Sequence, residues 1–281
     1  MEKPVTNANY QLLPGLSGNS WRDLDKHEDV YRFTPTQPLP FVNRQREGRI
    51  LRQLRPSQLA PRPKGYQSGR LTVEWIKGEP LAEERFIAQN PELLQLIIRL
   101  HQQPLFGYRL PLWSLLQRYW QLCRQHHPRW LRELKRLQRL GEPRPLRLVP
   151  LHMDLHPGNI IQSDKGLRLI DWEYSADGDI ALELATLCLQ NVEHSEAWIE
   201  AYANAFALES TPLRSQVKRW RPWLLLLQAS WFQLRAEQTQ CAAMTKQAAE
   251  SWRYLLPSLI EYDRTKHDKY PWSPNVGRRA V

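Results

Sequence analysis

Four polar residues in the middle of the chain have types and spacing that could serve one reaction. The segment His152-Met-Asp-Leu-His-Pro-Gly-Asn159 places Asp154 between a histidine and an asparagine, and the apolar run that follows ends in Asp171. The Asp154 carboxylate could orient a hydroxyl group and take up its proton. Asn159 and Asp171 offer the hard oxygen ligands that Mg2+ prefers. This combination is typical of phosphoryl transfer from a magnesium-bound nucleotide such as ATP to an alcohol.

The surrounding pattern predicts the elements that would position these side chains. An apolar stretch before the loop predicts a strand. Residues 159–162 and 167–170 predict two further strands, joined by the turn sequence Ser163-Asp-Lys-Gly166. Such a hairpin would bring Asp171 back beside the loop, so that three oxygen-bearing side chains converge. We expect His152 to brace the loop through hydrogen bonds rather than to move protons.

Each of these residues also has a purely structural interpretation. Asp154 and Asp171 could cap turns, and Asn159 could accept a strained loop conformation. All three at this spacing, on a strand, a loop and a hairpin, form a much rarer combination, which favours the catalytic interpretation. His156 alone would suggest a hydrolase, but the loop has no Ser or Cys nucleophile.

A glycine-rich turn near the N-terminus, Gly15-Leu-Ser-Gly18-Asn-Ser20, is a candidate for holding phosphate groups. Backbone N–H groups in such a turn can approach phosphates closely. The candidate nucleotide ligands are Gly15, Ser17, Gly18 and Ser20.

Phosphoryl transfer also needs a cation on the nucleotide phosphates, paired with a glutamate on a helix. No lysine lies between Lys26 and Lys64. We therefore expect Arg32, in a strand-like segment, to supply the charge, and Glu47, in a helical segment, to be its partner. A surface position for Glu47 is the alternative.

The character of the sequence changes near residue 79 and predicts two lobes. The first part contains short strands broken by Gly and Pro, including one at 71–75. From Asn90-Pro91, an N-cap residue followed by proline, apolar residues recur at helical spacing. The pattern predicts an α+β fold: a small β-rich nucleotide-binding lobe with a linker strand over 1–78, a large helical catalytic lobe over 79–263, and a loosely ordered basic tail over 264–281.

Composition and charge narrow the range of partners. The chain carries 39 Lys and Arg against 29 Asp and Glu, a net charge of +10. The basic helix expected after Pro128 has no aromatic side chains alternating with its arginines, so we expect a solvated face and no nucleic-acid partner. The longest apolar run, near Trp223–Phe232, is shorter than the ~20 residues of a membrane span, so no membrane partner is expected. Three widely spaced cysteines and the absence of a signal pattern favour a cytoplasmic protein.

The segment around Asp154 resembles the phosphotransferase family that includes aminoglycoside kinases and choline kinases. The resemblance is carried by the stretches His101–Gly107, Glu142–Leu148, Pro150–Asp154, Leu169–Tyr174, Asp177–Ala185 and Arg219–Leu225. It implies a protein-kinase-like fold of two lobes, catalysis by Asp154, and Mg2+ on Asn159 and Asp171. It also implies ATP as the co-substrate, with its adenine at Glu74, Trp75 and Ile76.

The resemblance further implies an enzyme that acts on a small hydroxylated amine, such as choline, an amino sugar, an aminoglycoside or a flat aromatic cation. We expect a monomer or weak dimer. Trp172, Glu173 and Asp177 follow the expected metal ligand and could bind such a cation by stacking, cation–π contact and charge. Core packing is the alternative for Trp172, and metal binding is the alternative for Glu173. The net positive charge disfavours a polycationic aminoglycoside. A non-catalytic binding module of the same fold would be expected to lack the catalytic carboxylate or a metal ligand, and all are present.

Overall fold

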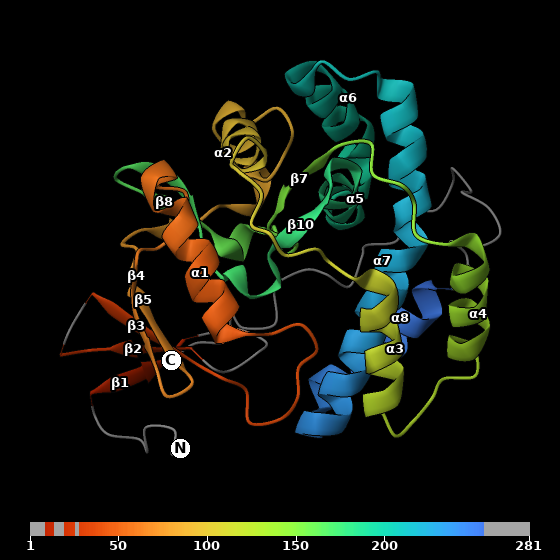
Figure 1. Cartoon of the computed structure of the whole chain (residues 1–281), viewed down its shortest axis with the longest axis horizontal. Coiled ribbons are helices and arrows are strands. Elements are labelled where there is room, and N and C mark those ends of the chain that lie inside the picture. Colours follow the sequence, from red (N-terminus) through yellow and green to blue (C-terminus); the bar gives the residue numbers. More distant parts are fainter. Residues whose placement is uncertain (1–8, 14–19, 26–27, 256–281) are drawn as a thin grey trace. The chain divides into compact units, whose positions relative to one another are not determined.

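The computed structural model describes residues 9–13, 20–25 and 28–255. An antiparallel sheet comes first and a largely helical part follows, which confirms the predicted α+β class (Figure 1). The described residues fall into two compact units, 9–108 with 149–177, and 109–148 with 178–255. The predicted lobe boundaries at residues 78 and 263 stay a prediction. The predicted tail lies outside the described residues.

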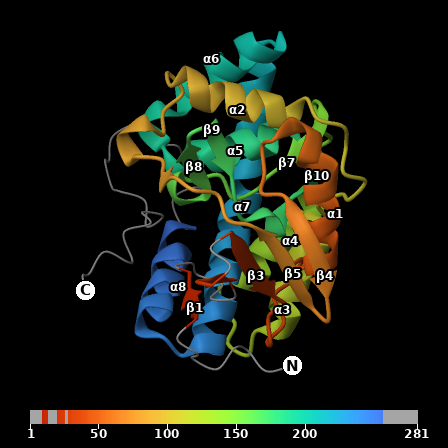
Figure 2. The same cartoon turned by 90° about the vertical axis from the view of Figure 1, so that its left-hand side faces the viewer.

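The first unit contains a five-stranded antiparallel sheet in the order β1-β2-β3-β5-β4. Its strands are β1 (Tyr10–Leu12), β2 (Ser20–Asp23), β3 (Asp29–Phe33), β4 (Pro63–Gln67) and β5 (Arg70–Glu74). Helix α1 (Arg44–Leu54) connects β3 to β4 and lies beside β4 and β5 in both ribbon views (Figures 1 and 2). The Asn43 side chain caps α1 by accepting a hydrogen bond from the Arg46 N–H.

The two faces of this sheet carry different side chains, because successive residues of a strand point to opposite faces. Val30 and Arg32 of β3 pair with Val73 and Leu71 of β5. Leu71 approaches Gly48 of α1, where an added Cβ would lie 3.0 Å from its Cδ1 atom. Arg32 therefore lies on the face that α1 covers, and the intervening strand residues lie on the opposite face.

Smaller strands complete the first unit and lead into the second. Strands β6 (Glu79–Pro80), β8 (Ile160–Ser163) and β9 (Gly166–Leu169) form an antiparallel sheet in the order β6-β8-β9. Strands β7 (Leu148–Leu151) and β10 (Ala176–Asp179) form a two-stranded sheet. Helix α2 (Pro91–His101) contacts β9, and the Asn90 side chain caps it at the Glu92 and Leu93 N–H groups. The predicted helix start at Asn90-Pro91 is thus confirmed.

The second unit is helical. Its helices are α3 (Leu112–Leu122), α4 (Trp130–Leu140), α5 (Ile180–Gln190), α6 (Ser195–Phe206), α7 (Ser210–Thr239) and α8 (Ala242–Tyr254). The long helix α7 packs against α3, α5, α6 and α8, and large buried side chains such as Trp130, Trp198 and Trp223 fill this core. Within the described part of the chain, no helix has the length and apolarity needed to cross a membrane.

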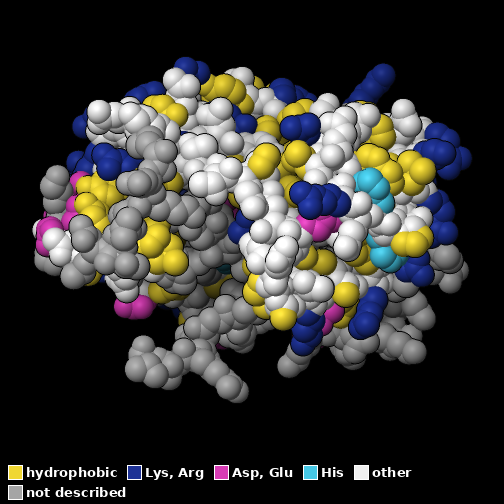
Figure 3. Space-filling model, turned by 90° about the horizontal axis from the view of Figure 1, so that it is seen from below, with side chains coloured by type: hydrophobic (Ala, Val, Ile, Leu, Met, Phe, Trp, Pro, Cys, Tyr) yellow, Lys and Arg dark blue, Asp and Glu magenta, His cyan; other side chains and the backbone are white. Residues whose placement is uncertain are grey.

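The surface charge reflects the composition. In the space-filling view, Lys and Arg side chains are scattered between hydrophobic and uncharged groups rather than gathered in one block (Figure 3). The basic helix predicted after Pro128 corresponds to α4, whose buried residues include Trp130, Leu134 and Leu137. Its cationic residues therefore share the helix with a conventional core-facing stripe.

Gly78, which directly precedes β6, packs closely against the backbone of β8. Its φ of 147° is rarely adopted by L-residues, and an added Cβ would lie 2.2 Å from the Gln162 carbonyl oxygen. We expect Gly78→Ala to lower the midpoint of thermal unfolding by about 4 °C or more, because both backbone strain and a collision with backbone must be relieved. Gly65→Ala is the control, since an added Cβ there meets nothing within 4 Å. Equal midpoints for the two variants would contradict this packing.

Candidate active site

The predicted hairpin is present and places the three candidate residues in one short region. Ile160 of β8 pairs with Leu169 of β9, and the Ile170 N–H donates to the Asn159 carbonyl at 2.9 Å. Asn159 therefore lies opposite Ile170, and Ile170 immediately precedes Asp171 in the chain. Because the turn between β8 and β9 is tight, Asp171 returns to the loop that begins after β7.

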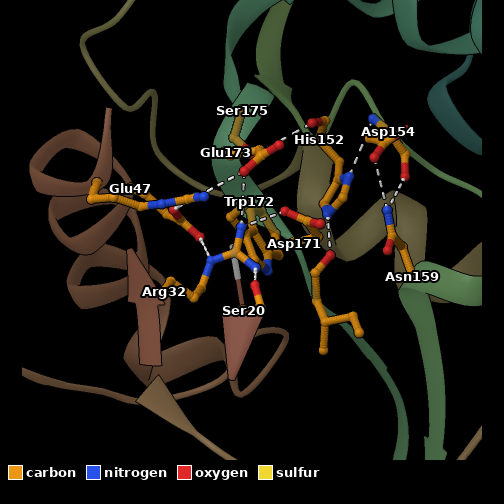
Figure 4. Close-up of polar contacts among 12 residues, drawn as sticks. Ser20, Arg32, Glu47, His152, Asp154, Asn159, Asp171, Trp172, Glu173 and Ser175 are labelled. Carbon is orange, nitrogen blue, oxygen red and sulfur yellow. Dashed lines mark hydrogen bonds and ion pairs between the residues drawn. The ribbon is translucent and has the colours of Figure 1, made fainter. Parts of the chain in front are cut away.

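A hydrogen-bonded pair forms the centre of this loop. The Asn159 side-chain nitrogen donates to the Asp154 carboxylate and to the Asp154 carbonyl, both at 2.9 Å (Figure 4). Both bonds use the nitrogen of the amide group, so the side-chain oxygen of Asn159 accepts none of them. The Asp154 side chain keeps 19% of its surface exposed, which leaves it accessible to a small molecule.

His152 links the loop to the end of the hairpin through two hydrogen bonds. Its Nε2–H donates to the Ile170 carbonyl at 2.9 Å, and its Nδ1 accepts the Asp154 N–H at 3.3 Å. Together these bonds select one tautomer of the buried ring and tie Asp154 to the hairpin. Met153 between them has a φ of 67° and Asp171 a φ of 65°, both in the left-handed region. Such non-glycine conformations cost of order 1 kcal/mol or more and persist where surrounding contacts fix them.

A buried ion network lies on the other side of Asp171. The Arg32 guanidinium contacts Glu47 at 2.7 Å, Asp171 at 2.5 Å and Glu173 at 3.2 Å. Arg44, which is fully buried, contacts the second oxygen of Glu47 at 2.7 Å and Glu173 at 2.8 Å. Three carboxylates thus surround two guanidinium groups, and all five side chains come from β3, α1 and the turn after β9. The predicted pair of Arg32 and Glu47 is part of this network.

The network has three acidic side chains and only two guanidinium groups, and the pKa values of the acidic groups differ as a result. Burial favours the neutral form of Asp171, but Arg32 and Arg44 outweigh it and hold the pKa of that carboxyl below its usual range. Burial and the nearby charge of Asp171 raise the pKa of Glu173 to about 7. Burial opposes the charge of Arg32, yet Asp171, Glu47 and Glu173 raise its pKa. The network therefore keeps Asp171 ionised and makes Glu173 easier to protonate than an ordinary glutamate.

Comparison with known proteins identifies the family. Residues 11–220 match the phosphotransferase enzyme family. The chain belongs to this phosphotransferase family. The match includes β3, α1 and the whole loop and hairpin.

Individual relatives agree with this assignment. Over 262 residues, covering 90% of both chains, this phosphotransferase is 43% identical to thiamine kinase of Escherichia coli, and equally to thiamine kinase of Shigella dysenteriae serotype 1. The solved structure of choline kinase LicA from Streptococcus pneumoniae superposes with a TM-score of 0.68 at 19% identity, covering 88% of this chain and 92% of that one. A structure of LicA in complex with AMP gives a TM-score of 0.70 at 20% identity, covering 89% and 91%. The predicted protein-kinase-like fold is thereby confirmed.

The predicted nucleotide residues of the phosphotransferase have different surroundings. Gly15, Ser17 and Gly18 lie outside the described residues. Ser20 accepts a hydrogen bond from Arg32 at 3.1 Å. The N–H groups of Glu74 and Trp75 donate to the carbonyls of Arg62 and Glu28, so they complete the sheet, while the buried Ile76 follows them. An adenine site at these three residues stays a prediction.

The three residues predicted to bind the acceptor all have structural partners. Trp172 is 1% exposed, and its indole N–H donates to the Leu169 carbonyl at 2.9 Å. The Asp177 carboxylate accepts the N–H groups of Phe106, Gly107 and Tyr108. These contacts, and the place of Glu173 in the ion network, favour packing and anchoring over contact with an acceptor.

Asp179, two residues after Asp177, likewise has internal partners. Its carboxylate accepts hydrogen bonds from the Leu146 and Ala181 N–H groups, from Gln216 and from Trp220. The acidic residues after Asp171 therefore bind donors within the protein itself, which explains their crowding in the sequence.

Arg44 belongs to the ion network but was not among the residues predicted from the sequence. A signal was available, because Arg44 and Glu47 are three residues apart directly after the N-cap residue Asn43 and so share one helix face. We expect Arg44→Met to lower the free energy of unfolding by ~3–5 kcal/mol, because it leaves Arg32 as the single cation of the network beside three buried acidic side chains.

Urea unfolding would measure this effect against Arg52→Met, an exposed position on the same helix, which should cost less than ~1 kcal/mol. Similar losses in the two variants would show that the network does not stabilise the first unit.

Proposed function

We propose that this phosphotransferase transfers the γ-phosphoryl group of ATP to the hydroxyl group of thiamine, which gives thiamine monophosphate. The observation that supports the acceptor is the 43% identity to thiamine kinase of Escherichia coli over 90% of both chains. The observation that supports turnover, rather than binding alone, is the presence of Asp154, Asn159 and Asp171 in one short region.

Asp154 is proposed as the group that addresses the acceptor. Its carboxylate would accept a hydrogen bond from the hydroxyl group and take up the proton as the oxygen attacks phosphorus. The hydrogen bond from Asn159 and the link through His152 fix the carboxylate in one orientation. Positioning of this kind is the main contribution that a protein makes to phosphoryl transfer.

Mg2+ is proposed as the metal, and the donor set fits it. Asp171 is ionised and offers a carboxylate, and Asn159 offers an amide oxygen whose nitrogen is already used. Mg2+ binds few protein ligands and completes its shell with water and phosphate oxygens, so two oxygen donors suffice. When bound, the ion would neutralise charge on the phosphates.

Arg32 is proposed as the cation for the nucleotide phosphates. It is buried, it stays charged, and Glu47 orients it from the helix while Ser20 contacts it from β2. This position places a permanent positive charge beside Asp171, so phosphates held there would lie next to the proposed metal ligand.

Removing the Asp154 carboxylate tests the chemistry. We expect Asp154→Ala and Asp154→Asn to reduce kcat by at least ~100-fold, because the hydroxyl group loses its proton acceptor, while the Kd for ATP stays within about threefold. Steady-state kinetics and calorimetric titration of ATP would measure the two effects. Asp164→Asn, in the exposed turn of the same hairpin, is the control and should retain normal turnover. Turnover near normal in a folded Asp154 variant would refute the assignment.

The acceptor is tested by identifying the product. The purified enzyme is incubated with ATP and Mg2+ and with thiamine, choline or an amino sugar in separate reactions, and the products are analysed by mass spectrometry. We expect thiamine monophosphate and little conversion of the other two. Turnover of choline or the amino sugar with no thiamine monophosphate would overturn the substrate and leave the phosphotransferase chemistry standing.

A further inference from the structure

His156 lies beside the proposed catalytic carboxylate and has no role in the site described above. Its Nε2 atom is 4.0 Å from Oδ2 of Asp154, and the two side chains keep 18% and 19% of their surface exposed. A direct hydrogen bond needs a separation of about 3 Å, so the two atoms do not bond to each other. They are therefore neighbours that a small polar group could join.

One ring nitrogen of His156 is already used within the loop. The Gly158 N–H donates to Nδ1 at 3.1 Å. Burial lowers the pKa of the ring, so the neutral form prevails at neutral pH. Because a backbone N–H can only donate, the single proton of the neutral ring lies on Nε2. His156 therefore presents an N–H donor on the side of Asp154.

The orientation of this ring is set by close packing against the turn that follows it. An added Cβ at Gly158 would lie 3.0 Å from Cε1 and 3.1 Å from Nδ1 of His156. The His156 carbonyl accepts the Asn159 N–H at 2.9 Å, which fixes the backbone of the same turn. The direction of the Nε2–H group is consequently determined by the loop itself.

The Asp154 oxygen nearest to His156 is also the one that Asn159 holds. The Asn159 side-chain nitrogen donates to Oδ2 at 2.9 Å (Figure 4). A carboxylate oxygen can accept two hydrogen bonds, so this bond is compatible with a second one from a hydroxyl group. The positions of the Oδ2 acceptor and of the Nε2–H donor are thus both fixed by neighbours in the loop.

The separation of these two atoms suits a hydroxyl group between them. A hydroxyl oxygen has one proton to donate and two lone pairs. At about 2.8 Å from Oδ2 and ~2.9 Å from Nε2, such an oxygen would span the 4.0 Å separation with an angle of roughly 90° between its two partners. It could donate to the carboxylate and accept from the ring, and its second lone pair would remain for attack on phosphorus.

We propose that His156 binds the acceptor hydroxyl group together with Asp154. The ring Nε2–H donates to the hydroxyl oxygen, and Asp154 accepts the hydroxyl proton. As the oxygen bonds to the γ-phosphorus, the proton passes to Asp154, the bond between the γ-phosphorus and the bridging oxygen breaks to release ADP, and the ring keeps its own proton. The two contacts direct the attacking lone pair, and phosphoryl transfer depends on such positioning. This inference rests on the proposed role of Asp154 but not on the identity of the acceptor.

Two substitutions separate this role from support of the loop. Asparagine can accept the Gly158 N–H in place of Nδ1 but has no group at the position of Nε2, whereas the longer glutamine can place an N–H there. We expect His156→Asn to lower kcat/KM for the acceptor about tenfold, the size of one hydrogen bond, and His156→Gln to keep it within about threefold. The KM for ATP and the midpoint of thermal unfolding should be those of the wild type in both variants.

A binding measurement isolates the hydroxyl group. Calorimetric titration compares thiamine with an analogue that has an ethyl group in place of the hydroxyethyl group. We expect His156→Asn to weaken thiamine about fivefold and to leave the affinity of the ethyl analogue unchanged, because the analogue has no oxygen for the ring to contact. If product analysis identifies another acceptor, that acceptor and its deoxy analogue replace this pair.

The outcomes distinguish this inference from the proposed function. If His156→Asn had the kcat/KM of the wild type, or weakened thiamine and the ethyl analogue equally, His156 would not bind the hydroxyl group. If both His156 variants lost activity together with a lowered unfolding midpoint, the residue would only support the loop. Either result, beside an inactive Asp154→Ala, would overturn this inference alone, whereas normal turnover in Asp154→Ala would overturn it together with the proposed function.

Discussion

The structure of the first unit depends on one constraint: two buried guanidinium groups must be neutralised by carboxylates from distant parts of the chain. Arg32 and Asp171 are separated by 139 residues, and Arg44 and Glu173 by 129. Because an unpaired buried charge is far more costly than an exposed one, the network forms as a whole. It joins β3, α1 and the turn after β9, and it therefore fixes the strand that carries Arg32 against the hairpin that carries Asp171. The position of Asp171 relative to Arg32 follows from these ion pairs.

The ion network and the hydrogen bonds of His152 together explain how two unfavourable backbone conformations are retained. Asp171 adopts a left-handed conformation, and its side chain is held by Arg32 at the same time. Met153 adopts a similar conformation between His152, which bonds to the Ile170 carbonyl, and Asp154, whose N–H bonds to the His152 ring. The left-handed conformations of Met153 and Asp171 help to set the directions of the Asp154 and Asp171 side chains. The stability that tolerates the strain comes from the ion pairs and from the buried histidine.

The sequence revealed the parts of the site that are local. The hairpin could be predicted because its turn residues adjoin its strands, and the helix start at Asn90 because capping involves neighbouring residues. The pairing of Arg44 with Glu173 could not, since no short-range pattern relates residues so far apart. Trp172 and Asp177 show a further limit of the sequence. Residue type does not distinguish a carboxylate that accepts backbone N–H groups from one that binds a cationic ligand, or a tryptophan that packs in the core from one that stacks on a ligand. The roles of Glu74 and Ile76 stay predictions for a similar reason, since backbone recognition leaves no signature in residue type.

The discontinuous layout of the first unit has a consequence during synthesis. Its sheet and α1 leave the ribosome early, yet the carboxylates of Asp171 and Glu173 follow only after residues 109–148, which belong to the second unit. Through that interval the guanidinium groups of Arg32 and Arg44 have only Glu47 as a partner within the network. The early sheet therefore cannot bury its charged residues favourably, and it must wait for more than half of the chain to be translated. Nascent chains of this protein should consequently be clients of cotranslational chaperones at the stage when the sheet is complete and the hairpin is not.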